Sequence, residues 1–450
     1  MTIAEKLAKY AAEFSIEEMP PKAVEEAQLH FADTVACIIA GADSDTAERA
    51  ASYAVNSCGG HPESSILGRG GVRCKAAFAA MANAVSAHCR DYDDMSASLN
   101  GHASAVLVPV VLAMGERHHI SGKGVLEAYM LGAEIDAVLG KMQANSTYAK
   151  AWNTTCTLGG AGAAAAACKL MGASQEDYTH AIGLAAGASG CVKENYGTAA
   201  KDISVGTTAF GGIFAAEMAS CGISANPKVF EGENGIYAAV GIRDDCGDID
   251  SILSKHQSDF FIPGMILKPY PTCRGNHNAL DCFQELVHTY NILPEQIQKV
   301  VCGVQQTVLD TDKYPYPATR EQAKFSIRYC LGKILYAGKL TTMDFAGTYA
   351  LDPRAAAFMD KVTVVLDTGI LDARFGAKVE ITDINGKTYT AQGCFASGDP
   401  LHPMSAKAVE NKLRDCFLVK YKPAQLNDLL KILRNILTIQ DICQLTERFS

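Results

Sequence analysis

The chain has 450 residues, 48% of them hydrophobic and 20% charged, which is the composition of a folded protein of two or three domains. Its 40 basic and 49 acidic side chains give a net charge of −9, so we expect neither nucleic acid nor a membrane surface as a partner. The 16 cysteines form no CxxC pair, which predicts neither a disulfide framework nor a zinc ribbon. Residues 1–6 lack the pattern of a secretory signal, so we expect a cytoplasmic protein.

Residues 1–262 are predicted to be almost entirely helical. Apolar side chains recur there at helical spacing, as at Ile3, Leu7 and Phe14. Residues 159–167 consist only of Gly and Ala, which is too weakly apolar for a membrane span. Small side chains let helix axes approach closely, so we expect a compact bundle in which some helices are buried on all sides.

A second unit is predicted over residues 263–396. It opens with a segment rich in Pro and Gly and then carries a helix, three strand candidates and an Asn-Gly hairpin turn, at residues 276–290, 299–304, 362–366, 377–382 and 385–386. Helical spacing returns over residues 397–450. We therefore predict a mainly α protein, with a large all-helical domain formed by both chain ends and an inserted α+β lid domain.

The densest polar cluster is His88-Cys89-Arg90-Asp91-Tyr92-Asp93-Asp94, followed by His102. These groups lie between two apolar helices and are costly to desolvate, so they either cap a helix or line a cavity. The spacing matches no known metal motif, and acid–base chemistry by Asp91 and His102 is the functional interpretation that we favour. A loop of solvated acids is the alternative.

Three further segments carry polar residues in apolar surroundings. Lys268, Arg274 and His277 lie around a Pro- and Gly-rich loop that precedes a helix, and together they could hold a carboxylate; solvated cations are the alternative. Tyr329 lies on an otherwise apolar helix, where a tyrosine is more often a core residue than a catalytic one. The segment that ends at Lys201 indicates only a loop. Nucleotide-binding motifs of the GxGxxG and GxxxxGK[ST] types are absent.

Taken in order, several segments resemble the MmgE/PrpD family, which includes 2-methylcitrate dehydratases, cis-aconitate decarboxylases and iminodisuccinate epimerases. The segments are residues 29–36, 88–94 with 101–102, 157–172, 268–273 with His277, 325–329, and 398–405. The resemblance implies a large helical domain with an inserted lid, no cofactor and no metal, and usually a homodimer. It places Asp91 and His102 on the helical domain, His277 and Tyr329 on the lid, and Lys201 in the pocket between them.

Two departures from the family pattern concern the substrate. Asn153 occupies a position where the dehydratases and decarboxylases have a His, and Thr207 stands where a Lys or Arg often follows Lys201. Both changes remove positive charge from the implied pocket. A tricarboxylate needs several cationic partners, so we expect a smaller or less charged acid to fit better.

The expected function is a lyase that acts on a small di- or tricarboxylic acid by proton transfer next to a carboxylate, like 2-methylcitrate dehydratase. The alternatives are a cis-aconitate-type decarboxylase, an epimerase of an iminodisuccinate-like dicarboxylate, and a catalytically silent binding protein of the same fold. We expect Asp91 and His102 to transfer the proton, and His277, with Arg274 or Lys268, to bind the carboxylate. Tyr329 is expected to donate a hydrogen bond or a proton.

Overall fold

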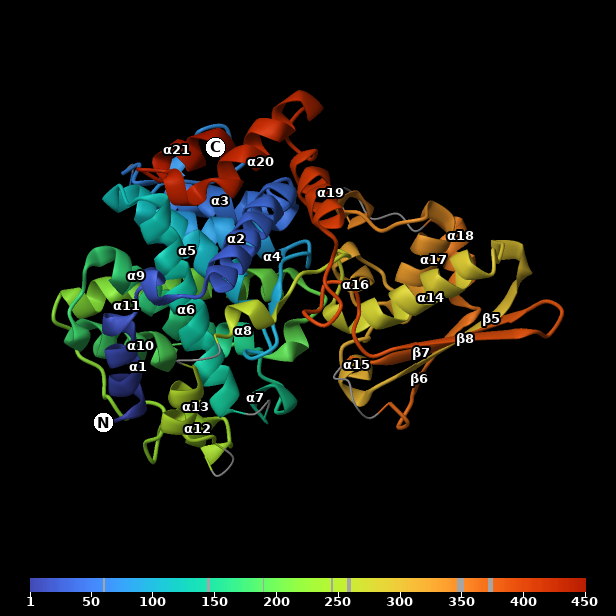
Figure 1. The fold of residues 1–450 in the computed structure, drawn as a ribbon, viewed down its shortest axis with the longest axis horizontal. Helices are drawn as coiled ribbons and strands as arrows, with labels where there is room; N and C mark the ends of the chain where they lie inside the picture. The colour runs from blue at the N-terminus through green and yellow to red at the C-terminus, as the bar shows by residue number, and fades with distance from the viewer. Residues whose placement is uncertain are drawn as a thin grey trace.

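The computed structural model describes residues 1–59, 61–143, 146–188, 190–243, 246–256, 260–345, 352–370 and 375–450. They form a large helical domain and a smaller domain that contains a sheet, which lie beside each other (Figure 1). Within these ranges, no helix combines the length and the apolar character needed to cross a bilayer.

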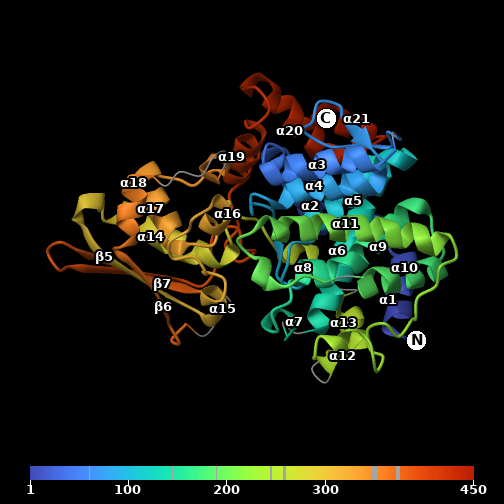
Figure 2. The ribbon, with the colours of Figure 1, turned by 180° about the vertical axis from the view of Figure 1, so that it is seen from behind.

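The helical domain is built from both ends of the chain. Its first part contains α1 (Ile3–Glu13), α2 (Pro21–Gly41), α3 (Asp45–Ser57), α4 (Ala76–His88), α5 (Ala103–His118), α6 (Gly122–Met142), α7 (Ser146–Ala149), α8 (Thr154–Thr157), α9 (Gly159–Met171), α10 (Gln175–Ala188), α11 (Ala199–Ser220), α12 (Ile236–Ala239) and α13 (Ile249–His256). The C-terminal part adds α19 (Ala406–Phe417), α20 (Leu426–Arg434) and α21 (Cys443–Phe449). Figure 2 shows α20 and α21 above α2 to α5 and α19 beside them, which confirms that the two chain ends share one domain.

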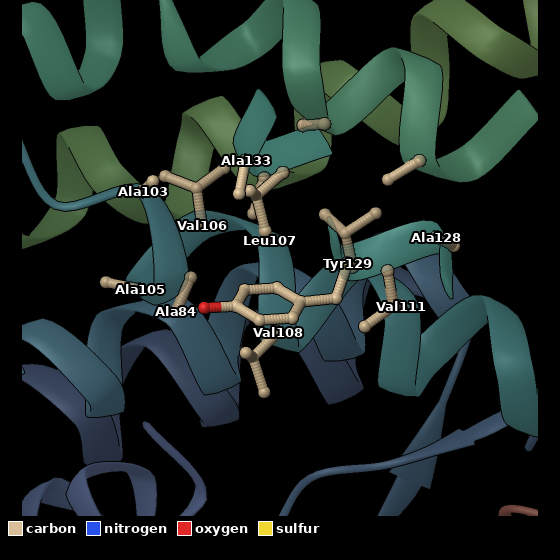
Figure 3. Packing of buried hydrophobic residues seen from close by; sticks show 14 of the residues in the cluster. Ala84, Ala103, Ala105, Val106, Leu107, Val108, Val111, Ala128, Tyr129 and Ala133 are labelled. Atoms are coloured by element: carbon tan, nitrogen blue, oxygen red, sulfur yellow. The ribbon is translucent and has the colours of Figure 1, made fainter. Parts of the chain in front are cut away.

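The centre of this domain consists of α5, α6 and α9, and the side chains of α5 from Ala103 to Glu116 are all buried. Helix axes come close because glycines face one another: a Cβ atom on Gly162 would lie 2.4 Å from the carbonyl oxygen of Gly132. The Tyr129 ring fills the space beside Val108 and Val111 of α5 (Figure 3). The predicted close packing of small residues is therefore confirmed.

The smaller domain, called the lid domain below, contains a four-stranded sheet in the order β6-β5-β7-β8. The strands are β5 (Ile297–Val304), β6 (Val362–Leu366), β7 (Ala377–Asp383) and β8 (Thr388–Gly393), and β5 runs parallel to β6 and antiparallel to β7. β7 and β8 are the arms of the predicted hairpin, whose turn contains Gly386 at a φ of 82°. This part confirms the predicted α+β unit.

Helices cover one face of this sheet, with α14 against β7 and β8 and α17 against β6. The helices of the lid domain are α14 (His277–Thr289), α15 (Gln306–Leu309), α16 (Arg320–Ala323), α17 (Ile327–Ala337) and α18 (Pro353–Met359). The apolar core of the lid domain contains residues from Ala279 to Ala391. The core of the helical domain contains residues up to Leu267 and again from Val409 onward. The predicted domain limit at 396 falls between these two cores, whereas the limit at 262 lies within the helical core, which continues through Met265 and Leu267.

Short antiparallel pairings fix two loops of the helical domain. β1 (Ser64–Ser65) pairs with β2 (Arg73–Cys74), and β3 (Met95–Ser96) pairs with β4 (Met265–Ile266). β3 follows the acidic cluster directly and β4 precedes Lys268 by two residues. The β3–β4 pairing therefore brings the acidic cluster against the segment through which the chain enters the lid domain.

Candidate active site

A small cavity lies where the two domains meet. Its walls include Asp91, His102, Asn153 and Lys201 from the helical domain and Arg274 and Phe325 from the lid domain. The free volume is about 40 Å³, which is room for a few water molecules. The polar residues of this cavity come from five separate segments of the chain.

The backbone of residues 88–94, the acidic loop, is held by three buried lysines. Lys268 donates to the carbonyl oxygen of Asp91 at 2.9 Å and to its Oδ1 at 2.7 Å. Lys324 donates to the carbonyl oxygen of Cys89 at 2.6 Å, and Lys412 donates to that of Tyr92 at 2.9 Å. Asp91 itself has a φ of 51°, an uncommon conformation for a residue other than glycine, and these bonds hold it there.

Arg90 ties the same loop to both domains. Its guanidinium donates to the carbonyl oxygen of Ala40 at 3.2 Å and to that of Phe345, in the lid domain, at 2.6 Å. It also forms an ion pair with Asp43. The acidic loop is thus a structural link between the domains as well as a wall of the cavity.

Asp93 orients two imidazole rings. Its Oδ2 lies 2.8 Å from Nδ1 of His88 and 3.0 Å from Nδ1 of His102, and the same nitrogen of His102 lies 2.8 Å from the carbonyl oxygen of Asp94. Because these partners accept hydrogen bonds, both rings carry a proton on Nδ1. Nε2 of His88 then accepts from Lys201 Nζ at 2.6 Å, and Nε2 of His102 is left for proton transfer.

The charge states follow from burial and from these contacts. Burial alone would raise the pKa of Asp91, but Lys201 and Lys268 outweigh it and bring that pKa well below its ordinary value. The pKa of Asp93 is likewise lowered, because His88 and His102 outweigh its burial. Burial lowers the pKa of His88 to about 4, so this imidazole is neutral. Burial disfavours the charge of Lys201, yet Asp91 and other nearby acids raise its pKa, which keeps it an ammonium.

Arg274 is a buried cation in the wall of the cavity. Its side chain is 4% exposed, and its Nε and Nη1 have no hydrogen-bond partner among the described residues. Nη2 lies 3.7 Å from Asp399, and the guanidinium lies over the Phe375 ring at 5.7 Å. A buried guanidinium with free donors matches the two oxygens of a carboxylate.

Some predicted site residues lie in the cavity wall and others do not. Asp91, His102, Arg274, Lys201 and Asn153 line it, and the Asn153 side chain also caps α8 by accepting from Thr155 N at 3.1 Å. Lys268 does not line the cavity and instead bonds to Asp91 behind the cavity wall.

His277, Tyr329 and Thr207 lie outside the wall of the cavity. His277 is fully buried, and its Nε2 donates to the carbonyl oxygen of Thr272 at 3.2 Å. Burial and the nearby cations Arg274 and Lys268 hold its pKa well below the ordinary value, so the ring is neutral. Tyr329 packs in the lid core with its ring 6.2 Å from that of Phe345, and Thr207 is exposed on α11.

Other residues at the cavity were not predicted as site residues. His88 joins Asp93 to Lys201, and its place in the acidic loop was the signal for it. Tyr196 and Phe325 place their rings 5.7 and 5.6 Å from the Lys201 ammonium, and Cys273 also lines the cavity. Cys273 and Phe325 lie in segments that carry the family resemblance, and Tyr196 lies in the polar segment before Lys201, but their place at the cavity depends on the meeting of the two domains.

The group formed by His88, Asp91, Asp93 and His102 could geometrically hold a metal ion, since one donor atom of each lies within 4.8 Å of the others. Two ammonium groups oppose this. Lys201 occupies Nε2 of His88, and Lys268 occupies Oδ1 of Asp91. The charge pattern therefore favours proton transfer and anion binding over cation binding.

In the wild-type chain, Nζ of Lys412 lies 2.6 Å from the buried Asp33 carboxylate. We expect Lys412→Met to lower the free energy of unfolding by about 3–5 kcal/mol, because it leaves this carboxylate without its cation. Urea unfolding measures the loss. Addition of Asp33→Asn to this variant should restore part of the stability. Lys407→Met on the exposed face of α19 is the matched control. Equal stability of the two single variants would contradict the assigned role of Lys412.

Stability should fall as the pH falls from 7 to 4.5, partly because of His88. The unfolded chain takes up a proton on this residue near pH 6.5, whereas in the folded protein the pKa is about 4, so acid favours unfolding. The contribution is roughly 2–3 kcal/mol over this range. Urea unfolding of His88→Gln should show a correspondingly weaker pH dependence, and the exposed control His61→Gln should keep the wild-type dependence. An unchanged slope in His88→Gln would refute the neutral, buried state of this ring.

Comparison with known proteins finds similarity over both domains. Residues 5–247 match the MmgE/PrpD N-terminal domain and residues 270–434 match the MmgE/PrpD C-terminal domain. The chain is 24% identical over 400 residues to the cis-aconitate decarboxylase of Homo sapiens. The aligned region covers 85% of this chain and 81% of the relative. It is also 24% identical over 368 residues to the cis-aconitate decarboxylase of Mus musculus. This aligned region covers 78% of this chain and 74% of the relative. The cis-aconitate decarboxylase-like protein oryM of Aspergillus oryzae is 26% identical over 385 residues, covering 81% and 79%.

Proposed function

Because the chain belongs to the MmgE/PrpD family, we propose that it is a lyase that acts on a small carboxylic acid by moving a proton at a carbon next to a carboxylate. One observation carries the proposal. Arg274, a buried cation with unfilled hydrogen-bond donors, lines the same cavity as His102, whose Nε2 is available for proton transfer. The cavity thus combines a carboxylate-binding group and a proton-transfer group.

The substrate carries at least one carboxylate, which the Arg274 guanidinium at the cavity wall binds. A second negative charge is balanced by Lys201, whose ammonium is shared between His88 and Asp91, at 2.6 and 3.5 Å. Lys268 is already bonded to Asp91, and Asn153 is neutral. A third carboxylate would lack a cation among the described cavity residues, so the charges favour a substrate with two negative groups near the reacting carbon.

His102 is the group that transfers the proton. Asp93 and the Asp94 carbonyl fix its ring through Nδ1, so Nε2 takes or gives the proton at the substrate carbon. The enolate that forms at the neighbouring carboxylate is stabilised by the positive charges of Arg274 and Lys201. Oδ2 of Asp91, an unpartnered and ionised oxygen beside the same cavity, is the second candidate base.

Two reactions fit this arrangement. In a decarboxylation, the C–C bond to one carboxylate breaks, carbon dioxide leaves, and protonated His102 gives its proton to the resulting carbanion. In a dehydration, neutral His102 removes a proton from carbon and then gives it to the hydroxyl group that leaves the neighbouring carbon as water. The names of the relatives favour decarboxylation as the first reaction to test. The tricarboxylates cis-aconitate and 2-methylcitrate are compared with dicarboxylic acids, which the charges of the cavity favour.

The test incubates the full chain in deuterated water with cis-aconitate, 2-methylcitrate and smaller dicarboxylic acids. NMR then reports deuterium at carbon, loss of carbon dioxide or loss of water. Carbon dioxide release identifies a decarboxylase, water loss a dehydratase, and exchange with inversion an epimerase. Binding without exchange or conversion of any acid would refute the enzyme and favour a binding protein of the same fold.

We expect His102→Gln to lower kcat by roughly 10²–10⁴ with little change in KM, because the proton transfer occurs only in the transition state. Steady-state kinetics on the identified substrate measures both constants. The exposed variant His61→Gln should keep wild-type kinetics. A fully active His102→Gln enzyme would assign the proton transfer to another group, with Asp91 the first to examine.

Arg274→Gln should instead raise KM, by roughly 10- to 150-fold, because one charge-assisted bond of about 1.5–3 kcal/mol is lost in the ground and transition states alike. The same assay separates this effect from a change in kcat. Exposed Arg49 offers a control, since Arg49→Gln removes equal charge outside the cavity. An unchanged KM in Arg274→Gln would show that Arg274 does not bind the substrate carboxylate.

A further inference from the structure

Three groups with metal-ligand chemistry meet at the end of α5 that is remote from His102. They are His119, which caps the C-terminus of α5, and Asp441 and Cys443 at the start of α21. Nδ1 of His119 lies 2.8 Å from Oδ2 of Asp441 and 3.9 Å from Sγ of Cys443, and donor atoms of all three lie within 4.8 Å of one another. Figure 1 shows α21 on the side of the helical domain away from the lid domain, so this cluster is separate from the cavity between the domains.

Backbone hydrogen bonds hold the two segments that carry these groups. The Gly122 amide donates to the carbonyl of Ile439 at 2.9 Å, and the Ile442 amide donates to that of Ile120 at 2.9 Å. The Cys443 amide donates to Oδ1 of Asp441 at 2.9 Å, which fixes these two ligands relative to each other. The three side chains therefore project from a preformed frame, and binding would order few additional groups.

His119 occupies a backbone position that normally suits glycine. It has a φ of 54° and ends α5 in the left-handed conformation. Glycine adopts this conformation at the least cost, and helices commonly end on it. The left-handed conformation is less favourable for His119 than for glycine. The His119 side chain is 73% exposed, so burial of the ring does not offset this cost.

The chemistry of the three donors suits zinc. A thiolate, an imidazole and a carboxylate are the ligands that Zn²⁺ takes in proteins, and an open site keeps water as its fourth ligand. With bonds of about 2.0–2.3 Å, the ligand atoms of a tetrahedral zinc lie about 3.3–3.6 Å apart. The separations of 2.8 and 3.9 Å here differ from these by about half an ångström, which side-chain rotation supplies.

We propose that His119, Asp441 and Cys443 form a zinc site with water as the fourth ligand. On binding, the Cys443 thiol releases its proton to solvent and the thiolate sulfur bonds the metal. Nδ1 of His119 also bonds the metal, and its proton moves through solvent to Nε2. The ion crosslinks the C-terminal segment to the end of α5 and stabilises their contact, independently of the reaction in the cavity.

Cobalt is the probe, because a thiolate bound to Co²⁺ gives a strong near-ultraviolet charge-transfer band and tetrahedral Co²⁺ gives intense visible bands. We expect the metal-stripped, reduced full chain to develop both bands with one equivalent of Co²⁺ and to lose them on addition of Zn²⁺. The four-residue group at the cavity has no cysteine, so a metal bound by those residues alone would give no thiolate band.

Variants assign the band to this site. Cys443→Ser should abolish the thiolate band, and His119→Asn, which tolerates the left-handed conformation, should weaken cobalt binding at least tenfold. Cys221→Ser, at an exposed cysteine, is the matched control and should keep the band. Absence of the band in the wild-type chain, or its survival in Cys443→Ser, would overturn the proposal and leave a surface hydrogen bond between His119 and Asp441.

Thermal unfolding gives a second readout that does not depend on colour. Zinc should raise the Tm of the wild-type chain and of Cys221→Ser, and it should leave the Tm of Cys443→Ser unchanged. Circular dichroism of the variants without metal confirms that each is folded before the comparison. An equal zinc effect in Cys443→Ser would place the ion elsewhere and refute the site.

Discussion

The structure of the cavity depends on buried ammonium groups bonded to the backbone of the acidic loop. The Cys89, Asp91 and Tyr92 carbonyls accept from lysines that lie 235, 177 and 320 residues away in the sequence. Each lysine comes from a different part of the chain: the lid domain, the segment that enters it and the C-terminal helix α19. A buried charge is costly unless it is paired, so these contacts form only when all three parts have packed around the loop.

The same bonds give the loop a defined electrostatic state. The ammonium groups of Lys201 and Lys268 keep Asp91 ionised although it is completely buried. Asp93 in turn holds two imidazoles through Nδ1, which fixes their tautomers and leaves Nε2 of His102 available. A carboxylate that orients an imidazole and a cation that balances developing charge are the two parts that proton transfer next to a carboxylate requires.

The position of the lid domain is coupled to the acidic loop. Lys324 and the Phe345 carbonyl of the lid contact Cys89 and Arg90 of the loop, and the Tyr314 hydroxyl donates to the Tyr196 carbonyl at 2.8 Å. The cavity has about 40 Å³ free in this arrangement, and residues of both domains form its wall. A movement of the lid domain relative to the acidic loop would therefore change the size of the cavity.

The amino-acid sequence was sufficient to predict the local structure, the fold class and the polar segments that matter. Helical spacing, the Asn-Gly turn and strand alternation depend on near neighbours, so α14 and β5 to β7 lie within two residues of their predicted limits. The order of the motifs also identified the family, and with it Asp91, His102 and Lys201 as residues of one pocket.

Which of the candidate residues meet in the cavity could be seen only in the folded molecule. Lys268 bonds to Asp91, Tyr329 packs in the lid core and Thr207 faces solvent, whereas His88 and Phe325 contact Lys201. Sequence patterns report which face of a helix is apolar, but not which distant charge will neutralise a buried one. That choice is made by packing, because a buried ion pair between residues hundreds of positions apart exists only after the elements that carry them have come together.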